Sequence, residues 1–310
     1  MFSVIIPLYN KAPYVEKAIR SVLVQTYQEF ELIVVDDGSQ DSSLEIAEKF
    51  KSSQVQIISQ VNAGVSTARN NGVKLTKYSY LCFLDADDWW EPTFLEEMKM
   101  LIDEFPDAGI YGSSYYKVKN GKNIPANIGV DAGFERGEVN YFQVYAKTMW
   151  MPLTSISVVI PKKVFIKQNG FKPQLKLGED FDLWVRIAIK YSVVLLNKPL
   201  AYYNQDVEQK LRGVVLDKIY KPETHFIFNM DFLVDDERKN KDLKQLLDKL
   251  RVYTLFRYRI QKAHPEELKK EIKKIDFKNQ SFATQLQYKL PVIFFKKYYV
   301  SKRYIRDLIR

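Results

Sequence analysis

The chain has very little of the two residue types that build most metal and redox sites in proteins. Its 310 residues include a single cysteine, Cys82, and two histidines, His225 and His264. One cysteine excludes an intramolecular disulfide framework and a thiolate zinc cluster, so a reducing compartment such as the cytoplasm is the expected location. A histidine-based metal site is not expected either, and both histidines are predicted to lie on the surface.

Long hydrophobic runs are also missing. No apolar stretch reaches the roughly 18 residues that a membrane-spanning helix needs. The opening segment FSVIIPLY has no basic stretch before it and no small-residue cleavage site after it, which predicts a core strand rather than a signal peptide. Hydrophobic residues nevertheless make up 46% of the chain, which is typical of a globular protein with a large core.

The net charge of +9 is unevenly distributed along the chain. Residues 1–203 hold 22 basic and 23 acidic residues, whereas residues 204–310 hold 25 and 15. This basic third predicts an anionic partner, either a membrane surface or nucleic acid. We expect no nucleic acid, because the basic region has no recognised nucleic-acid-binding module.

Short apolar runs alternate with amphipathic stretches through the first hundred residues. Nearly continuous apolar strands separated by helices predict an α/β fold with a mostly parallel, doubly wound sheet. The expected strands are 2–9, 31–37, 55–59, 80–85, 107–118, 156–160 and 192–197, and the expected helices are 13–27, 41–51, 64–76 and 179–191. Residues 120–137 are predicted to be a loop. The sequence therefore predicts an α/β domain over 1–205 and a basic helical extension over 206–310.

Acidic residues stand where such a sheet would present them together. The segments are DDGS at 36–39, DADD at 85–88 and ED at 179–180. Ligands bind at the carboxyl ends of parallel strands, so these side chains are expected to share a crevice. Each cluster alone also fits a turn, a polar loop or a helix N-terminus. Together they suit a nucleoside diphosphate, whose base and ribose need acceptors and whose phosphates need a divalent cation.

Four segments together resemble family-2 inverting glycosyltransferases with the GT-A fold. They are SVIIPLYNKAPYVEKAIRSVLVQTYQEFELIVVDDGSQDSS, NAGVSTARNNG, YLCFLDADDWWEP and GEDFDLWVRIA. The resemblance covers about residues 2–203, and the C-terminal third does not share in it. It implies transfer of a sugar from a nucleoside diphosphate, by family habit UDP, to a hydroxyl of a glycan or lipid-linked acceptor. It also implies a divalent cation, Mn²⁺ or Mg²⁺.

The resemblance assigns the nucleobase to the ends of the first two strands. Pro7 and Tyr9 would frame the base, with Tyr9 stacked on it. Asp37 would accept a hydrogen bond from the imide N–H of the base, and Asp36 would support that loop or the ribose.

The remaining donor contacts would come from the third and fourth segments. Asn62, Gly64 and Arg69 would face the ribose and phosphates, at a helix N-terminus that favours anions. Asp85 would bind the ribose, with Ala86 beside it.

The chemistry would belong to Asp180 and Asp87. In an inverting displacement the acceptor hydroxyl loses its proton as the new bond forms, and Asp180 would take it as general base. Glu179 would position the loop and is the alternative base. Asp87 would be the direct metal ligand, and the cation would offset charge on the departing diphosphate. Trp150 would stack on an acceptor sugar, although a tryptophan between two methionines is also typical of a core.

Other functions share parts of this pattern. An NAD-dependent enzyme should carry G-x-G-x-x-G after the first strand, where this chain reads PLYNKAPY. That function is excluded. A nucleotidyltransferase and a non-catalytic nucleotide- or glycan-binding relative remain as alternatives.

The last thirty residues predict a helix that lies on a membrane surface. Residues 281–310 carry seven Lys or Arg and one Asp. At 100° per residue, one stripe gathers the apolar residues Phe294, Tyr298, Ile305, Leu308 and Ile309. The opposite side carries Lys296, Arg303, Arg306 and Arg310. This pattern predicts peripheral attachment to an anionic membrane on its cytoplasmic face. A helix docked on the protein's own core is the alternative.

Overall fold

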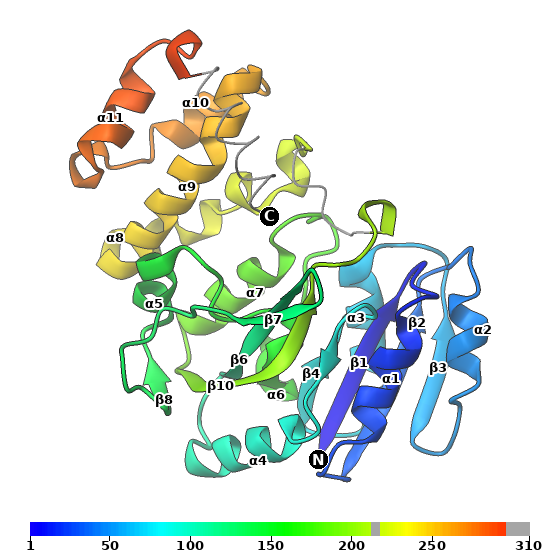
Figure 1. The fold of residues 1–310 in the computed structure, drawn as a ribbon. Helices are drawn as coiled ribbons and strands as arrows, with labels where there is room; N and C mark the ends of the chain where they lie inside the picture. Colours follow the sequence, from blue (N-terminus) through cyan, green and yellow to red (C-terminus); the bar gives the residue numbers. More distant parts are fainter. Residues whose placement is uncertain (212–217, 296–310) are drawn as a thin grey trace. The chain divides into compact units, whose positions relative to one another are not determined.

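The computed structural model describes residues 1–211 and 218–295, and the chain divides into two units, Met1–Leu216 and Asp217–Arg310 (Figure 1). The division falls beyond the expected boundary at 205 because the following segment stays bonded to the first unit. There the N–H of Gln205 donates to the carbonyl of Val118 at 2.9 Å. The N–H of Glu208 donates to the hydroxyl of Tyr14 at 3.3 Å.

The first unit contains a single mixed sheet flanked by helices (Figure 1). One half is parallel, as expected, in the order β3 (Val55–Ser59), β2 (Phe30–Asp36), β1 (Phe2–Leu8) and β4 (Tyr80–Phe83). Every residue of β1 and β2 is buried, which explains their nearly continuous apolar runs. Leu8 pairs with Asp36, so these two strands end side by side.

The other half of the sheet is mixed. It continues with β9 (Val158–Pro161), β6 (Ile110–Lys119), β10 (Val193–Asn204) and β5 (Trp89–Trp90). β9 is antiparallel to both β4 and β6, whereas β10 runs parallel to β6. β10 also pairs antiparallel with β5, the short strand that follows β4 in the sequence. The end of the first unit therefore lies beside the residues that follow β4.

Seven α-helices belong to the described part of the first unit: α1 (Val15–Leu23), α2 (Ser43–Glu48), α3 (Val65–Lys74), α4 (Phe94–Glu104), α5 (Tyr141–Thr148), α6 (Lys162–Lys167) and α7 (Glu179–Ala188). α3 packs on β1 and β2. Gly72 allows this close approach, since a Cβ there would lie 2.6 Å from a methyl carbon of Ile5.

The predicted loop over 120–137 is wrong in part. β7 (Lys122–Pro125) pairs antiparallel with β6, and β8 (Arg136–Val139) pairs antiparallel with β10. All four β7 residues are exposed, so the strand has no apolar alternation to reveal it. The turn before it is Asn120-Gly121 with φ of +49° and +68°, which suits a two-residue hairpin. That dipeptide was the available signal.

The second unit is helical in its described part, as expected. Its α-helices are α8 (Val234–Lys239), α9 (Lys241–Gln261), α10 (Pro265–Ile272) and α11 (Phe282–Lys289). The surface position predicted for His225 is wrong, because this side chain is 3% exposed and its Nδ1 accepts from the N–H of Ile227. Burial lowers the pKa of His225 to about 3, so the imidazole is neutral.

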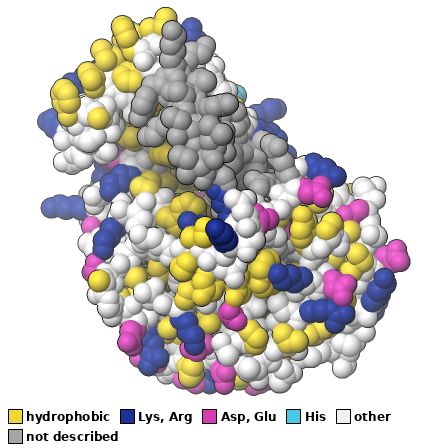
Figure 2. All heavy atoms as spheres, viewed as in Figure 1, with side chains coloured by type: hydrophobic (Ala, Val, Ile, Leu, Met, Phe, Trp, Pro, Cys, Tyr) yellow, Lys and Arg dark blue, Asp and Glu magenta, His cyan; other side chains and the backbone are white. Residues whose placement is uncertain are grey.

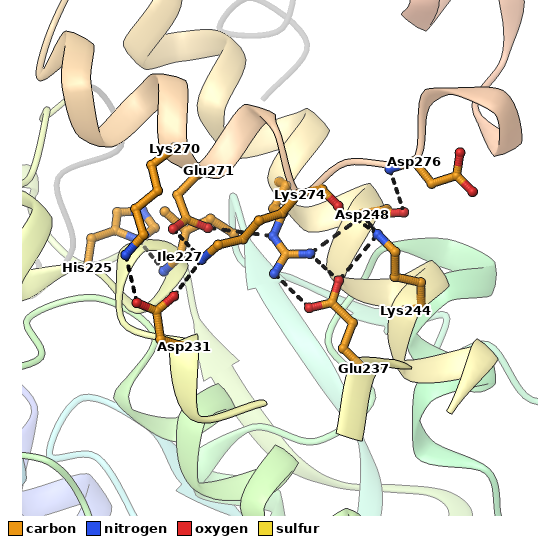
Figure 3. Close-up of polar contacts among 11 residues, drawn as sticks. His225, Ile227, Asp231, Glu237, Lys244, Asp248, Lys270, Glu271, Lys274 and Asp276 are labelled. Carbon is orange, nitrogen blue, oxygen red and sulfur yellow. Dashed lines mark hydrogen bonds and ion pairs between the residues drawn. The ribbon is translucent and has the colours of Figure 1, made fainter. Parts of the chain in front are cut away.

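A cluster of buried charged side chains lies among the apolar residues of this second unit (Figure 3). Arg251 on α9 is fully buried and donates to both carboxylate oxygens of Glu237 on α8. Its Nε lies 3.7 Å from Glu271 on α10. Asp248, 2% exposed, is paired with Lys244 one turn away. These contacts join the three helices through opposite charges.

No described helix is long and apolar enough to cross a membrane. Most of the predicted interfacial helix, residues 296–310, lies outside the described residues.

Candidate functional site

The acidic segments predicted to share a crevice follow neighbouring strands. Asp36 is the last residue of β2. After β4 ends, the N–H of Leu84 donates to the carbonyl of Ile5 at 3.0 Å, which carries residues 85–88 along β1 to the same edge. The ends of these strands thus bring both acidic segments to one side of the sheet.

Asp37 shapes the loop that leads into α3. Its carboxylate accepts hydrogen bonds from the N–H groups of Ala63 and Gly64, both at 2.8 Å, and from the Gln60 amide at 2.7 Å. Its carbonyl accepts from the Asn62 side chain at 2.9 Å. Gly64 adopts φ +90° in this loop, a conformation that favours glycine. Asp37 and Asn62, both expected to face the ligand, are therefore bonded to each other's loops.

Tyr9 is an exposed aromatic residue next to these loops. It follows β1, which contains the buried Pro7, and 45% of Tyr9 is exposed. The next residue, Asn10, has φ +49°; its N–H donates to the Ser39 hydroxyl at 3.1 Å, and its side chain accepts from the N–H of Gln40 at 2.7 Å. These contacts fasten the β1–α1 loop to the loop after β2, where Asp36 accepts from the N–H of Ser39 at 3.3 Å.

Arg69, on α3, connects the acidic segments. Its side chain is 3% exposed, and its Nη2 donates to Asp85 at 2.6 Å and to the Ser155 hydroxyl at 3.2 Å. Nη1 lies 3.5 Å from a carboxylate oxygen of Glu179. The guanidinium, expected to face ribose and phosphates, thus has two carboxylates as partners. It joins the end of β4 to the start of α7 through η1 (Ser155–Ser157).

The DADD segment forms a tight turn whose carboxylates point to different partners. The N–H of Asp88 donates to the carbonyl of Asp85 at 3.0 Å, and Asp88 itself accepts from the N–H of Asn204 at 2.7 Å. Ala86 and Asp88 are both 2% exposed. Asp87 forms an ion pair with Lys11. Burial raises the pKa of Asp87 despite this ion pair, and it raises that of Asp88 further with the charges of its neighbours.

Asp180 lies at the first turn of α7, half-buried, and accepts from the N–H of Phe181 at 2.7 Å. Burial and then the negative charge of Glu179 raise the pKa of Asp180 to about 7, against the opposing effects of the Phe181 N–H and Arg69. A carboxyl group that titrates near neutral pH is suited to accept and release a proton.

Trp150 is half-buried and held in a fixed orientation. Its Nε1 donates to the hydroxyl of Tyr115 at 2.6 Å, and the Lys117 ammonium lies 4.3 Å from its ring centroid. Burial raises the pKa of Tyr115, and the charge of Asp180 adds to that increase. Trp150 is thus connected through Tyr115 to the surroundings of Asp180.

Two residues of the site were missed from the sequence, Lys11 and Ser155. Lys11 pairs with Asp87, and the Ser155 hydroxyl donates to Asp85 at 3.2 Å. No local motif reveals either contact, because each residue reaches its acidic partner from a distant part of the chain.

Comparison with known proteins identifies the family. Residues 3–165, more than half of the chain, match the family described as glycosyl transferase family 2. The chain belongs to glycosyl transferase family 2. This member is 34% identical over 210 residues to glycosyltransferase GlyA of Streptococcus pneumoniae, covering 65% of this chain and 30% of that protein. It is 33% identical over 202 residues to an uncharacterized glycosyltransferase of Rickettsia felis, covering 64% of this chain and 32% of that protein. The chain therefore spans about a third of the length of these relatives.

The family member also resembles solved structures of S. aureus TarS. The TarS 1-349 complex with UDP aligns with a TM-score of 0.67 at 20% identity, covering 88% of this chain and 78% of that chain. The complex with UDP-GlcNAc aligns with a TM-score of 0.65 over 93% of this chain. This likeness confirms the predicted fold, a GT-A-type α/β domain with a helical C-terminal region.

Proposed function

We propose that this chain is an inverting glycosyltransferase that moves a sugar from a UDP-sugar to a hydroxyl of a glycan or lipid-linked acceptor. One observation carries the proposal: Arg69 joins Asp85, in the donor segment, to Glu179, the neighbour of the proposed base. The segments proposed to bind the donor and to supply the base are thereby linked through one buried side chain. Family membership and the likeness to TarS, a protein solved with UDP and with UDP-GlcNAc, support it.

In this proposal the exposed ring of Tyr9 stacks on the base, with Pro7 behind it. A carboxylate has about four acceptor positions, and the protein itself uses three on Asp37, which leaves one for the imide N–H. Asp36 supports the same loop through Ser39. The N-terminus of α3, beginning after Gly64, faces the anionic part of the donor.

Asp87 is the proposed ligand of a divalent cation, Mn²⁺ or Mg²⁺. When bound, that cation would stabilise the negative charge of the departing diphosphate. Within residues 1–211 and 218–295, no group of three or more His, Cys, Asp or Glu side chains could hold a metal by itself. Asp87 would therefore supply a carboxylate oxygen and leave the other coordination positions to water and phosphate. Mg²⁺ and similar hard cations commonly bind in this way. Asp85 accepts from Arg69 through one carboxylate oxygen and from Ser155 through the other, whereas Asp87 is paired with Lys11 through Oδ2 alone, so Asp87 is the better candidate.

Asp180 is the proposed general base. Its ionised carboxylate would take the proton of the acceptor hydroxyl as that oxygen bonds to the anomeric carbon. Glu179 is paired with Arg69, and its negative charge raises the pKa of Asp180. Its proposed role is therefore to position the loop and to adjust the basicity of Asp180. Trp150, oriented by Tyr115, offers a ring face for an acceptor sugar.

We also propose peripheral attachment to the cytoplasmic face of a membrane. Large apolar side chains are exposed near α11, including Phe282 at 79%, Ile293 at 76% and Phe294 at 67%. Apolar side chains gather along this end of the second unit in Figure 2. Apolar area beside a basic segment favours an anionic lipid surface.

The first experiment is a thermal-shift screen of UDP, GDP and dTDP with Mn²⁺ or Mg²⁺. A ligand that binds only the native state stabilises it by about 2.7 kcal/mol at a hundred times its Kd. We expect the largest shift with UDP plus metal. Release of UDP from a UDP-sugar would then exclude a binding-only relative, and release of pyrophosphate from UTP would instead indicate a nucleotidyltransferase.

A further inference from the structure

A lysine occupies the carboxylate proposed to hold the metal. The Lys11 ammonium forms an ion pair with Oδ2 of Asp87 and also donates to the carbonyl of Leu211. The side chains of Lys11 and Asp87 are only 13% and 18% exposed. An ammonium and a divalent cation cannot share one carboxylate oxygen at contact distance without strong repulsion.

The backbone of Lys11 is fixed where it can reach Asp87. Its N–H donates to the Ser43 hydroxyl at 2.7 Å, and its carbonyl accepts from the N–H groups of Tyr14 and Val15 at 2.9 and 3.0 Å. The left-handed Asn10 turns the chain just before it. The ammonium is therefore directed to Asp87 by anchored backbone and is not a solvated side chain that meets it by chance.

The charge balance explains why a cation belongs there. Asp85 and Glu179 add negative charge beside Asp87, Asp88 and Asp180, and charge from neighbouring carboxylates raises the pKa of each of these three. In the described part of the chain, the ion-pair partners of these five carboxylates are Arg69 and Lys11. Arg69 pairs with Asp85 and Glu179, which leaves Lys11 as the positive charge beside Asp87 and Asp88.

We propose that Lys11 is an internal cation that holds Asp87 until the donor arrives and competes with the divalent metal for it. Metal binding requires the ammonium to leave Asp87, so metal alone binds weakly. The donor diphosphate brings negative charge that can receive both cations, so metal and nucleotide bind together. This inference rests on the proposed metal role of Asp87 and adds a residue that sets metal affinity.

The test is titration with Mn²⁺ alone, followed by the EPR signal of free Mn²⁺. Lys11→Met should bind Mn²⁺ about tenfold more tightly than wild type, or better, because a unit charge about 4 Å from a divalent ion is removed. Lys11→Arg keeps the charge and should bind as weakly as wild type. Lys49→Met removes an exposed lysine on the same unit and should change nothing.

The double variant Lys11→Met/Asp87→Asn should lose the gained affinity, since the gain depends on Asp87. Equal Mn²⁺ affinity of wild type and Lys11→Met, including no binding by either, would overturn the inference. So would a gain that survives Asp87→Asn. A separate titration with UDP judges the proposed function. If UDP binds to none of the proteins while the Mn²⁺ difference persists, the donor assignment fails, whereas the competition between Lys11 and the metal for Asp87 stands.

Discussion

Replacing Arg251 by methionine should destabilise the second unit. The change keeps an unbranched stem that is shorter than arginine and leaves Glu237 and Glu271, both buried, without their guanidinium partner. Removing one partner of a buried ion pair costs about 3–5 kcal/mol. Glu237 keeps a contact with Lys244 at 3.3 Å and Glu271 keeps Lys274, so we expect about 3 kcal/mol, the lower end of that range.

Urea unfolding followed by two signals measures this loss. All four tryptophans, at 89, 90, 150 and 184, lie in the first unit, so tryptophan fluorescence reports that unit. Far-UV circular dichroism reports the helices of the second unit as well. The variant should shift the circular dichroism transition and leave the fluorescence transition in place. Arg238→Met is the matched control, because Arg238 pairs with Asp235 on an exposed face and should behave as wild type.

The pH dependence gives an independent check. Burial alone would raise the pKa of Glu237, but Arg251 and Lys244 outweigh burial and lower it. Stability from this depressed pKa is present above the unfolded value and is lost as the pH falls through the folded value. Without Arg251 the Glu237 carboxylate becomes easier to protonate. The difference in unfolding free energy between wild type and Arg251→Met should therefore become smaller as the pH falls from 7 to 5. A cost below about 1 kcal/mol at pH 7, or a gap that widens in acid, would refute this reasoning.

Three further predictions concern activity and membrane binding. Asp180→Asn should lower turnover by about 10²–10⁴-fold with little change in donor affinity, and a near-normal rate of this variant would assign the base to Glu179 instead. Wild-type turnover should rise with pH through about 7 as Asp180 ionises. Asp87→Ala should remove the Mn²⁺ dependence of UDP binding in calorimetry and Asp88→Ala should be milder, and metal-dependent binding by the Asp87 variant would contradict the assignment. The full chain should pellet with anionic vesicles more than a chain ending near residue 285, and less so as salt rises; equal pelleting would count against attachment.

The sequence predicts the fold and the acidic edge well because both depend on local patterns. β1 and β2 are buried on both faces, so their apolar runs are nearly continuous, and parallel strands necessarily end together. β7 was missed because all four of its residues are exposed, which leaves only the Asn-Gly turn before it as a signal. The contacts of Asp37 with the β3–α3 loop were also beyond prediction, since they depend on the left-handed Gly64.

The partners of charged residues were harder to predict than their positions, and Arg69 shows why. A helix-borne arginine near an anion site suggests a phosphate contact, yet the fold buries this side chain beside Asp85, Ser155 and Glu179. A buried guanidinium must be paired, because an isolated charge in a low-dielectric interior is very costly. Which carboxylate pairs with it depends on how η1 and the start of α7 meet β4. The pairing of Lys11 with Asp87 depends on tertiary structure in the same way, because the sequence alone shows Lys11 only as a basic residue in a loop. The charge balance of this site therefore follows from tertiary structure, and variants of Lys11 and Arg69, rather than of the carboxylates alone, are needed to test the proposed roles in metal and nucleotide binding.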